Sequence, residues 1–141
     1  MKRLVLDTNV LLSFVTDRNI HQQECSRKIF EEALALKRIL LISFHVLTEF
    51  TYVLDTVYGV ERERIKEMIR ELISYPGTEI LYGIDMAALL DVWPETVPDY
   101  GDAVIVGAWA ALKRKEAAVF TFDKKFQSIL KKRLDIPVWI P

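Results

Sequence analysis

Two aspartates in this chain each come at the end of a short apolar run that is typical of a buried β-strand. Asp7 follows residues 3–6, and Asp123 follows residues 118–121. In open α/β sheets, ligands bind beyond the carboxyl ends of the strands, so both carboxylates are candidate ligand-binding groups. Aspartate at a strand-to-helix junction is also the usual helix N-cap, so each residue alone has a purely structural explanation.

Two further acids lie on apolar faces of predicted helices. Glu49 shares a helix face with Val46 and Phe50, where a carboxylate is costly unless it is paired or bound to a metal. Asp102 lies in the first turn of an apolar helix, where the macrodipole favours an anion. The structural alternatives are that Glu49 reaches water from the edge of the apolar face or pairs with a lysine, and that Asp102 only stabilises the helix start. For Asp99, one turn earlier, we favour capping over a role as a supplementary ligand.

The acids carry more weight as a set, because all four can be placed at the same end of the sheet. Carboxylates so close together repel one another, and the cluster persists only if cations neutralise it or protons are taken up. The two histidines, His21 and His45, are isolated in the sequence, so the available donors are hard oxygens. Such donors predict Mg²⁺ or Mn²⁺ rather than zinc.

The surrounding sequence alternates short apolar segments with helical patterns, which predicts an α/β fold with a parallel sheet flanked by helices. Strands are expected at residues 2–6, 39–42, 78–81 and 117–120, with a last edge strand at 138–140. Helices are expected after Asp7 and at residues 21–37, 44–57, 61–74, 84–93, 99–113 and 123–134.

The composition suits one domain spanning residues 1–141. Its 19 basic and 20 acidic residues give a net charge of -1, which argues against a protein that coats nucleic acid passively. Cys25 is the only cysteine, which excludes an internal disulfide and a multi-cysteine metal site. No apolar run is long enough to span a membrane and no secretory signal follows Met1, so we expect a cytoplasmic protein without a membrane partner.

At its four acids the chain resembles the PIN-domain family, and within it the VapC-type toxin ribonucleases. The matching motifs are residues 5–11, 43–54, 99–105 and 121–126, and the run 136–138 is also typical. They occur in the family's order over nearly the whole chain, although residues 55–95 are not distinctive. The third motif departs from the family's usual leucine or isoleucine and alanines at Val104, Val106 and Gly107, which leaves its acid in place.

This resemblance implies a PIN-like α/β/α sandwich and metal-dependent endonuclease cleavage of RNA, with one or two Mg²⁺ or Mn²⁺ ions. The residues expected to be both catalytic and metal-binding are Asp7, Glu49, Asp102 and Asp123. Asn9 and Thr121 are expected to orient them, and Lys124 or Lys125 to contact the RNA backbone. Toxin members of the family form homodimers and are silenced by a small antitoxin whose tail covers the acidic site. A second copy and an antitoxin are therefore the expected protein partners.

Two other functions compete with this interpretation. A phosphatase could use Asp7 as a nucleophile, but phosphatases of the HAD type usually carry a second aspartate two positions on, where this chain has Asn9. A PIN-like fold can also serve as a non-catalytic binding module. Degenerate modules of that kind are expected to lose acids, whereas all four positions are filled here.

Overall fold

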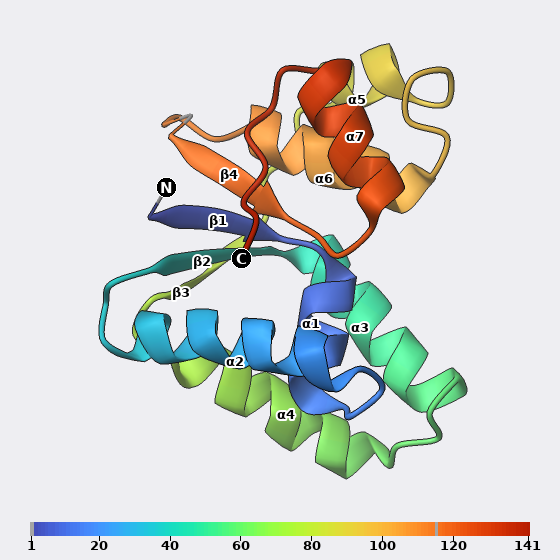
Figure 1. Cartoon of the computed structure of the whole chain (residues 1–141). Helices are drawn as coiled ribbons and strands as arrows, with labels where there is room; N and C mark the ends of the chain where they lie inside the picture. Colours follow the sequence, from blue (N-terminus) through green and yellow to red (C-terminus); the bar gives the residue numbers. More distant parts are fainter. Residues whose placement is uncertain (1, 115) are drawn as a thin grey trace.

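The computed structural model describes residues 2–114 and 116–141 and has a four-stranded sheet at its centre (Figure 1). The strands are β1 (Arg3–Leu6), β2 (Ile39–Ser43), β3 (Thr78–Leu81) and β4 (Ala117–Phe120). They lie in the order β3-β2-β1-β4, and every pairing is parallel. Because β1 pairs with both β2 and β4, the ends of these three strands lie next to one another at one edge of the sheet.

Helices cover both faces of the sheet. They are α1 (Thr8–Val15), α2 (Ile20–Leu34), α3 (Phe44–Thr56), α4 (Arg62–Ser74), α5 (Met86–Val92), α6 (Tyr100–Ala110) and α7 (Lys124–Lys132). Figure 1 shows α1 to α4 on one side and α5 to α7 on the other. This arrangement confirms the predicted α/β/α sandwich. None of the helices in the described part of the chain has the length and apolar character needed to cross a bilayer.

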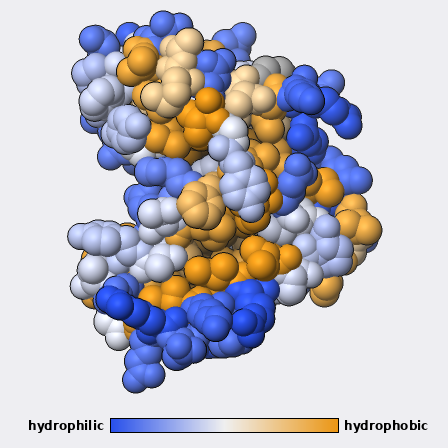
Figure 2. All heavy atoms as spheres, turned by 180° about the vertical axis from the view of Figure 1, so that it is seen from behind, coloured by the Kyte–Doolittle hydropathy of each residue, from blue (hydrophilic) through white to orange (hydrophobic). Residues whose placement is uncertain are grey.

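The hydrophobic core lies on both faces of the sheet, because helices bury each face. In a parallel sheet covered on both faces, strands are continuous apolar runs, as β4 and most of β1 are here. The largest fully buried side chains include Phe30, Phe50, Phe120 and Phe126, which come from both helical layers and from the sheet. On the surface, Figure 2 shows apolar residues gathered in the middle of one face, between hydrophilic residues above and below.

Three strands pass directly, or after a short turn, into a helix through a polar cap. Asp7 caps α1, Ser43 caps α3, and Asp123 caps α7, each by accepting backbone N–H groups that have no partner within the helix. These caps fix where α1, α3 and α7 begin, and all three helices begin at the carboxyl edge of the sheet. Side chains in the first turns of these helices therefore gather at that edge.

The predicted strands at 78–81 and 117–120 have the expected bounds, but the predicted edge strand at 138–140 is wrong. Val138 forms only an isolated parallel bridge with Val119. Prolines at 137 and 141 lack a backbone N–H, which prevents a longer ladder here. Three predicted helices are shorter than expected: 21–37 ends at Leu34, 99–113 ends at Ala110, and 84–93 covers only Met86–Val92.

Candidate active site

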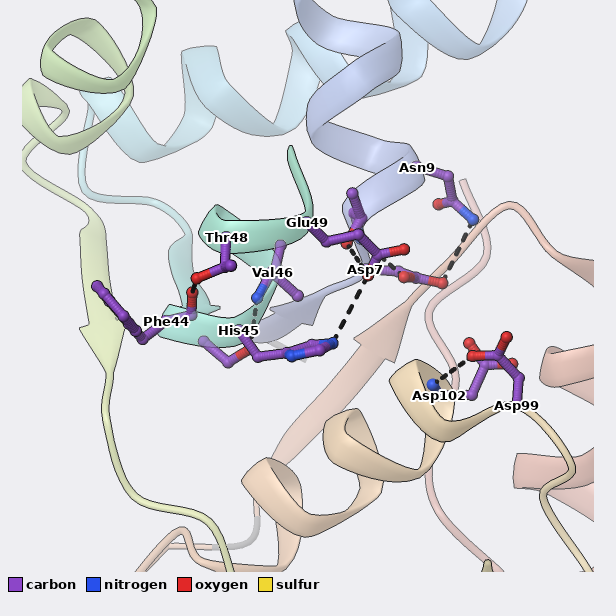
Figure 3. A network of polar contacts seen from close by, with 11 residues as sticks. Asp7, Asn9, Phe44, His45, Val46, Thr48, Glu49, Asp99 and Asp102 are labelled. Atoms are coloured by element: carbon purple, nitrogen blue, oxygen red, sulfur yellow. Dashed lines mark hydrogen bonds and ion pairs between the residues drawn. The ribbon is translucent and has the colours of Figure 1, made fainter. Parts of the chain in front are cut away.

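The four acids singled out from the sequence line one cavity of about 360 Å³ at the carboxyl edge of the sheet. They come from four separate segments: the end of β1, the second turn of α3, the first turn of α6 and the cap of α7. Figure 3 shows Asp7 and Glu49 on one side of this space, with Asp99 and Asp102 across from them. Side chains that are far apart along the chain are therefore brought together by the parallel topology.

Asp7 is the most enclosed of the acids, with 7% of its surface exposed. Its Oδ1 accepts the backbone N–H of Thr8 at 2.7 Å, and its Oδ2 accepts the Thr121 hydroxyl at 2.6 Å and the Asn9 amide at 3.3 Å. Burial, together with the charges of Glu49 and Asp123, raises the pKa of Asp7 to about 6, although the hydrogen bonds from Thr121 and Thr8 lower it.

Thr121 joins Asp7 to two other parts of the site. Its buried hydroxyl donates to Asp7 and accepts both the Asn9 amide and the Asp123 backbone N–H, each at 3.1 Å. The side-chain oxygen Oδ1 of Asn9 in turn accepts the Phe122 N–H at 3.2 Å. The start of α1 is thereby tied to the end of β4. Both predicted orienting residues lie where they can hold Asp7, and that role remains a prediction.

Glu49 occupies the edge of the apolar face of α3 and not its centre. Its neighbours Val46 and Phe50 are fully buried, whereas 46% of the Glu49 side chain is exposed. Its Oε2 accepts the Thr8 hydroxyl at 3.0 Å and lies 3.7 Å from Nε2 of His45. The carboxylate therefore reaches the cavity without being buried. Its neighbours among the described residues are the Thr8 hydroxyl and the His45 imidazole, and not the lysine that was one of the predicted alternatives.

The start of α6 contributes two acids with different environments. Asp99 caps the helix, as expected, with Oδ1 accepting the Asp102 N–H at 2.9 Å, and it also lines the cavity. The Asp102 carboxylate accepts no hydrogen bond from the residues that the structure describes. Burial, followed by the charges of Asp7, Asp99, Asp123 and Glu49, raises the pKa of Asp102 to about 8.

Asp123 closes the site from the α7 side. Its Oδ1 accepts the backbone N–H groups of Lys125 at 2.9 Å and Phe126 at 3.1 Å, so it is a helix cap as well as a wall of the cavity. Of the two lysines expected to contact RNA, Lys125 lines the cavity, and Lys124 is not among its lining residues.

Two residues beside the site were not predicted from the sequence. His45 is isolated from other histidines and cysteines in the sequence, yet it lies four residues before Glu49, a spacing that places both on one helix face. Gly101 lies where a Cβ atom would come within 3.1 Å of Asp99 Oδ1 and 3.5 Å of Glu49 Oε2. Glycine there lets the start of α6 approach α3 closely.

The donor set fits a hard divalent cation. Carboxylates are the ligands that Mg²⁺ and Mn²⁺ prefer. Burial, together with repulsion from the neighbouring acids, raises the pKa values of Asp7 and Asp102, and a bound cation would oppose both effects. Within the described ranges, however, no three acidic, histidine or cysteine side chains are grouped closely enough to bind one ion directly. A cation in this cavity would be held partly through water, as Mg²⁺ usually is in proteins.

The chain is an all-parallel α/β/α domain with acids at the carboxyl edge of its sheet, and this is the edge beyond which ligands bind in α/β proteins of this kind. The family model described as "PIN domain" matches residues 4–132, and the chain belongs to this family. No curated protein sequence matches the chain.

A solved structure supports the same fold. The chain is similar to one in the crystal structure of VapBC2 from Rickettsia felis bound to a DNA fragment from their promoter. The two chains are 16% identical, the match covers 90% of this chain and 92% of the other, and the TM-score is 0.62. At this identity the likeness establishes the fold and not a shared activity.

Proposed function

We propose that this PIN domain is a metal-dependent endoribonuclease that hydrolyses phosphodiester bonds in RNA. The observation that carries the proposal is the convergence of four carboxylates from distant segments on one cavity. Structural caps alone explain Asp7, Asp99 and Asp123, but they do not explain why Glu49 and Asp102 face the same space. Binding of a cation explains the whole set, because it offsets the repulsion among the acids.

In this proposal Asp7 and Asp102 are the central metal ligands, and Glu49 and Asp123 complete the acidic wall. A bound Mg²⁺ or Mn²⁺ supplies the positive charge that stabilises the charge developing on the phosphate. Thr121 and Asn9 keep Oδ2 of Asp7 in a fixed orientation through the bonds described above. Lys125 lines the cavity, and in this proposal its ammonium group pairs with a phosphate oxygen of the substrate.

The test is Asp7→Asn, which keeps the size of the side chain and removes its charge. We expect RNA cleavage with added Mn²⁺ to fall by about 100-fold or more, because a central ligand is lost. Asp91→Asn, on the exposed side of α5, is the matched control and should cleave like the wild type. Full activity in Asp7→Asn would remove the metal-ligand role. Failure of the wild-type chain to bind Mn²⁺ in a titration would favour a non-catalytic binding module.

We further propose that the chain is the toxin of a toxin–antitoxin pair, acts in the cytoplasm and forms a homodimer. The resemblance of its acidic motifs to VapC-type toxins supports this, as does the fold shared with the VapBC2 structure. An apolar groove along α3 and α4, lined by Phe44, Leu47, Tyr52 and Ile69, offers surface for protein contacts.

The toxin proposal predicts growth arrest when the chain is expressed alone. Co-expression of a small protein encoded beside it should relieve the arrest, and light scattering should give the mass of two chains. If the wild-type chain cleaves RNA in vitro but its expression alone does not arrest growth, the chain is a nuclease outside any toxin pair.

A further inference from the structure

One histidine beside the acidic cavity has a buried ring nitrogen that the proposed reaction does not use. His45 is in the first turn of α3, one turn before Glu49, and its Nε2 lies 3.7 Å from Glu49 Oε2 (Figure 3). That nitrogen is shielded from solvent and forms no hydrogen bond with the described residues. Because buried polar atoms in proteins are nearly always hydrogen-bonded, its environment calls for a partner.

The start of α6 accounts for the burial of this nitrogen. A Cβ atom at Gly101 would lie 3.6 Å from His45 Nε2 and 3.5 Å from Glu49 Oε2, so the glycine backbone packs directly over the pair. Glu49 Oε2, at 3.7 Å, is an acceptor close to the enclosed nitrogen. Their separation exceeds a usual hydrogen-bond length by about 0.8 Å, which a small rotation of either side chain can close.

We propose that His45 is a positioning residue that fixes which oxygen of Glu49 faces the cation. The Thr8 hydroxyl already donates to Oε2 at 3.0 Å, and Nε2 of His45 lies 3.7 Å from the same atom, to which an Nε2–H group could donate after a small rotation. Two donors on Oε2 leave Oε1 as the oxygen that faces the cavity. This inference rests on the proposed function in one respect, namely that Glu49 contributes to cation binding.

The experiment compares His45→Phe, which keeps a ring without a donor, with His45→Gln, which keeps a donor of similar reach. Mn²⁺ affinity is measured by calorimetry on the full chain at one pH, together with kcat and KM for RNA cleavage and the unfolding midpoint. We expect His45→Phe to bind Mn²⁺ about tenfold more weakly, with a lower kcat and an unchanged KM, since the loss of a group that orients a ligand typically weakens metal binding to this extent or more. His45→Gln should stay within about twofold of the wild type. His21→Phe on α2, the other histidine, is the control and should bind like the wild type.

A double-mutant cycle tests whether Thr8 and His45 act on one oxygen. If they do, the effects of Thr8→Val and His45→Phe on Mn²⁺ affinity are not additive, because both act through the orientation of Glu49. Wild-type Mn²⁺ affinity in His45→Phe, or equal losses in His45→Phe and His45→Gln, would overturn the positioning role.

Glu49→Gln separates this inference from the proposed function. If Glu49→Gln is impaired while His45→Phe is normal, only the role of His45 fails. If Glu49→Gln binds Mn²⁺ and cleaves RNA normally, Glu49 is not part of the site and both ideas fail. Should His45→Phe not fold, a crystal structure of the wild type with Mn²⁺ decides the matter. The inference requires His45 Nε2 within about 3.2 Å of Oε2, with Oε1 toward the ion, and the reverse arrangement would refute it.

Discussion

Hydrogen bonds, more than depth, distinguish the two aspartates at the centre of the cavity. Asp7 is almost completely enclosed, yet its pKa rises only to about 6 because Thr121 and Thr8 donate to its carboxylate. Asp102 lies in a more open position, but among the described residues nothing donates to its carboxylate, and its pKa rises to about 8. Donors stabilise the charged form and thereby lower the pKa, so their absence leaves burial and repulsion unopposed at Asp102.

Removing the Thr121 hydroxyl should therefore destabilise the site. Thr121→Val keeps the shape of this buried side chain but leaves Asp7 Oδ2, the Asn9 amide and the Asp123 N–H without a shared partner. We expect the free energy of unfolding at neutral pH to fall by about 1–3 kcal/mol, as measured by urea denaturation. Thr121→Ser retains the hydroxyl and should lose much less. Equal stability of the valine variant and the wild type would show that the network contributes little.

The sequence was sufficient to predict residues of the site that follow strands or start helices. Asp7, Asp123 and Asp99 stand at junctions that the apolar pattern marks, and all three cap helices that line the cavity. His45 and Gly101 are not at such junctions, and only the four-residue spacing from Glu49 marks His45 in the sequence. Their importance arises where α3 and α6, which are more than forty residues apart in sequence, come into contact, and no local pattern records that approach.

At the level of elements, the strands were easier to predict than the ends of the helices. Buried parallel strands are short apolar runs bounded by polar residues, and β3 and β4 have the bounds that this pattern predicts. Helix ends depend on turns that the apolar period does not reveal. Leu36, for example, adopts a left-handed conformation with φ 58°, just after α2 has ended at Leu34.

One glycine is required for β3 to pair with β2. The Gly77 N–H donates to Ala33 O at 3.0 Å, and a Cβ atom at Gly77 would lie 2.8 Å from that oxygen and closer still to Arg38 O. Both contacts are with backbone atoms, which cannot rotate away as a side chain can. We expect Gly77→Ala to lower the free energy of unfolding by about 2–4 kcal/mol, measured by denaturant titration.

Gly83 provides the control for that prediction. The nearest atom to a Cβ at this position is Ala111 Cβ at 3.9 Å, an ordinary contact distance. Gly83→Ala should therefore change the free energy of unfolding by less than about 0.5 kcal/mol. Similar effects of the two substitutions would mean that the backbone around Gly77 packs less tightly against Ala33 and Arg38 than the distances indicate.

For the whole molecule, the acidic cavity links stability to pH and to metal. In the metal-free protein the folded-state pKa values of Asp7 (about 6) and Asp102 (about 8) lie above the ordinary value of 3.8. The folded state therefore holds more protons than the unfolded state between these values. Stability contributed by the protonated forms is complete below about pH 4 and is lost as pH rises to about 8.

We therefore expect the free energy of unfolding of the chain in EDTA to be lower at pH 8.5 than at pH 5.5. This loss should be larger in the wild type than in Asp102→Asn. That variant carries no charge at position 102, so at pH 8.5 it should be more stable than the wild type by about 1–3 kcal/mol, a range that allows for solvent screening. At pH 5.5 the difference should be much smaller.

Mn²⁺ should stabilise the wild type most at high pH, where protons do not compete for the carboxylates, and should stabilise Asp102→Asn far less. Denaturant titrations at both pH values, with and without Mn²⁺, measure each of these differences. Parallel pH profiles for wild type and variant would mean that Asp102 keeps its charge in the folded protein without a cation. The cavity would then not depend on metal for its neutrality.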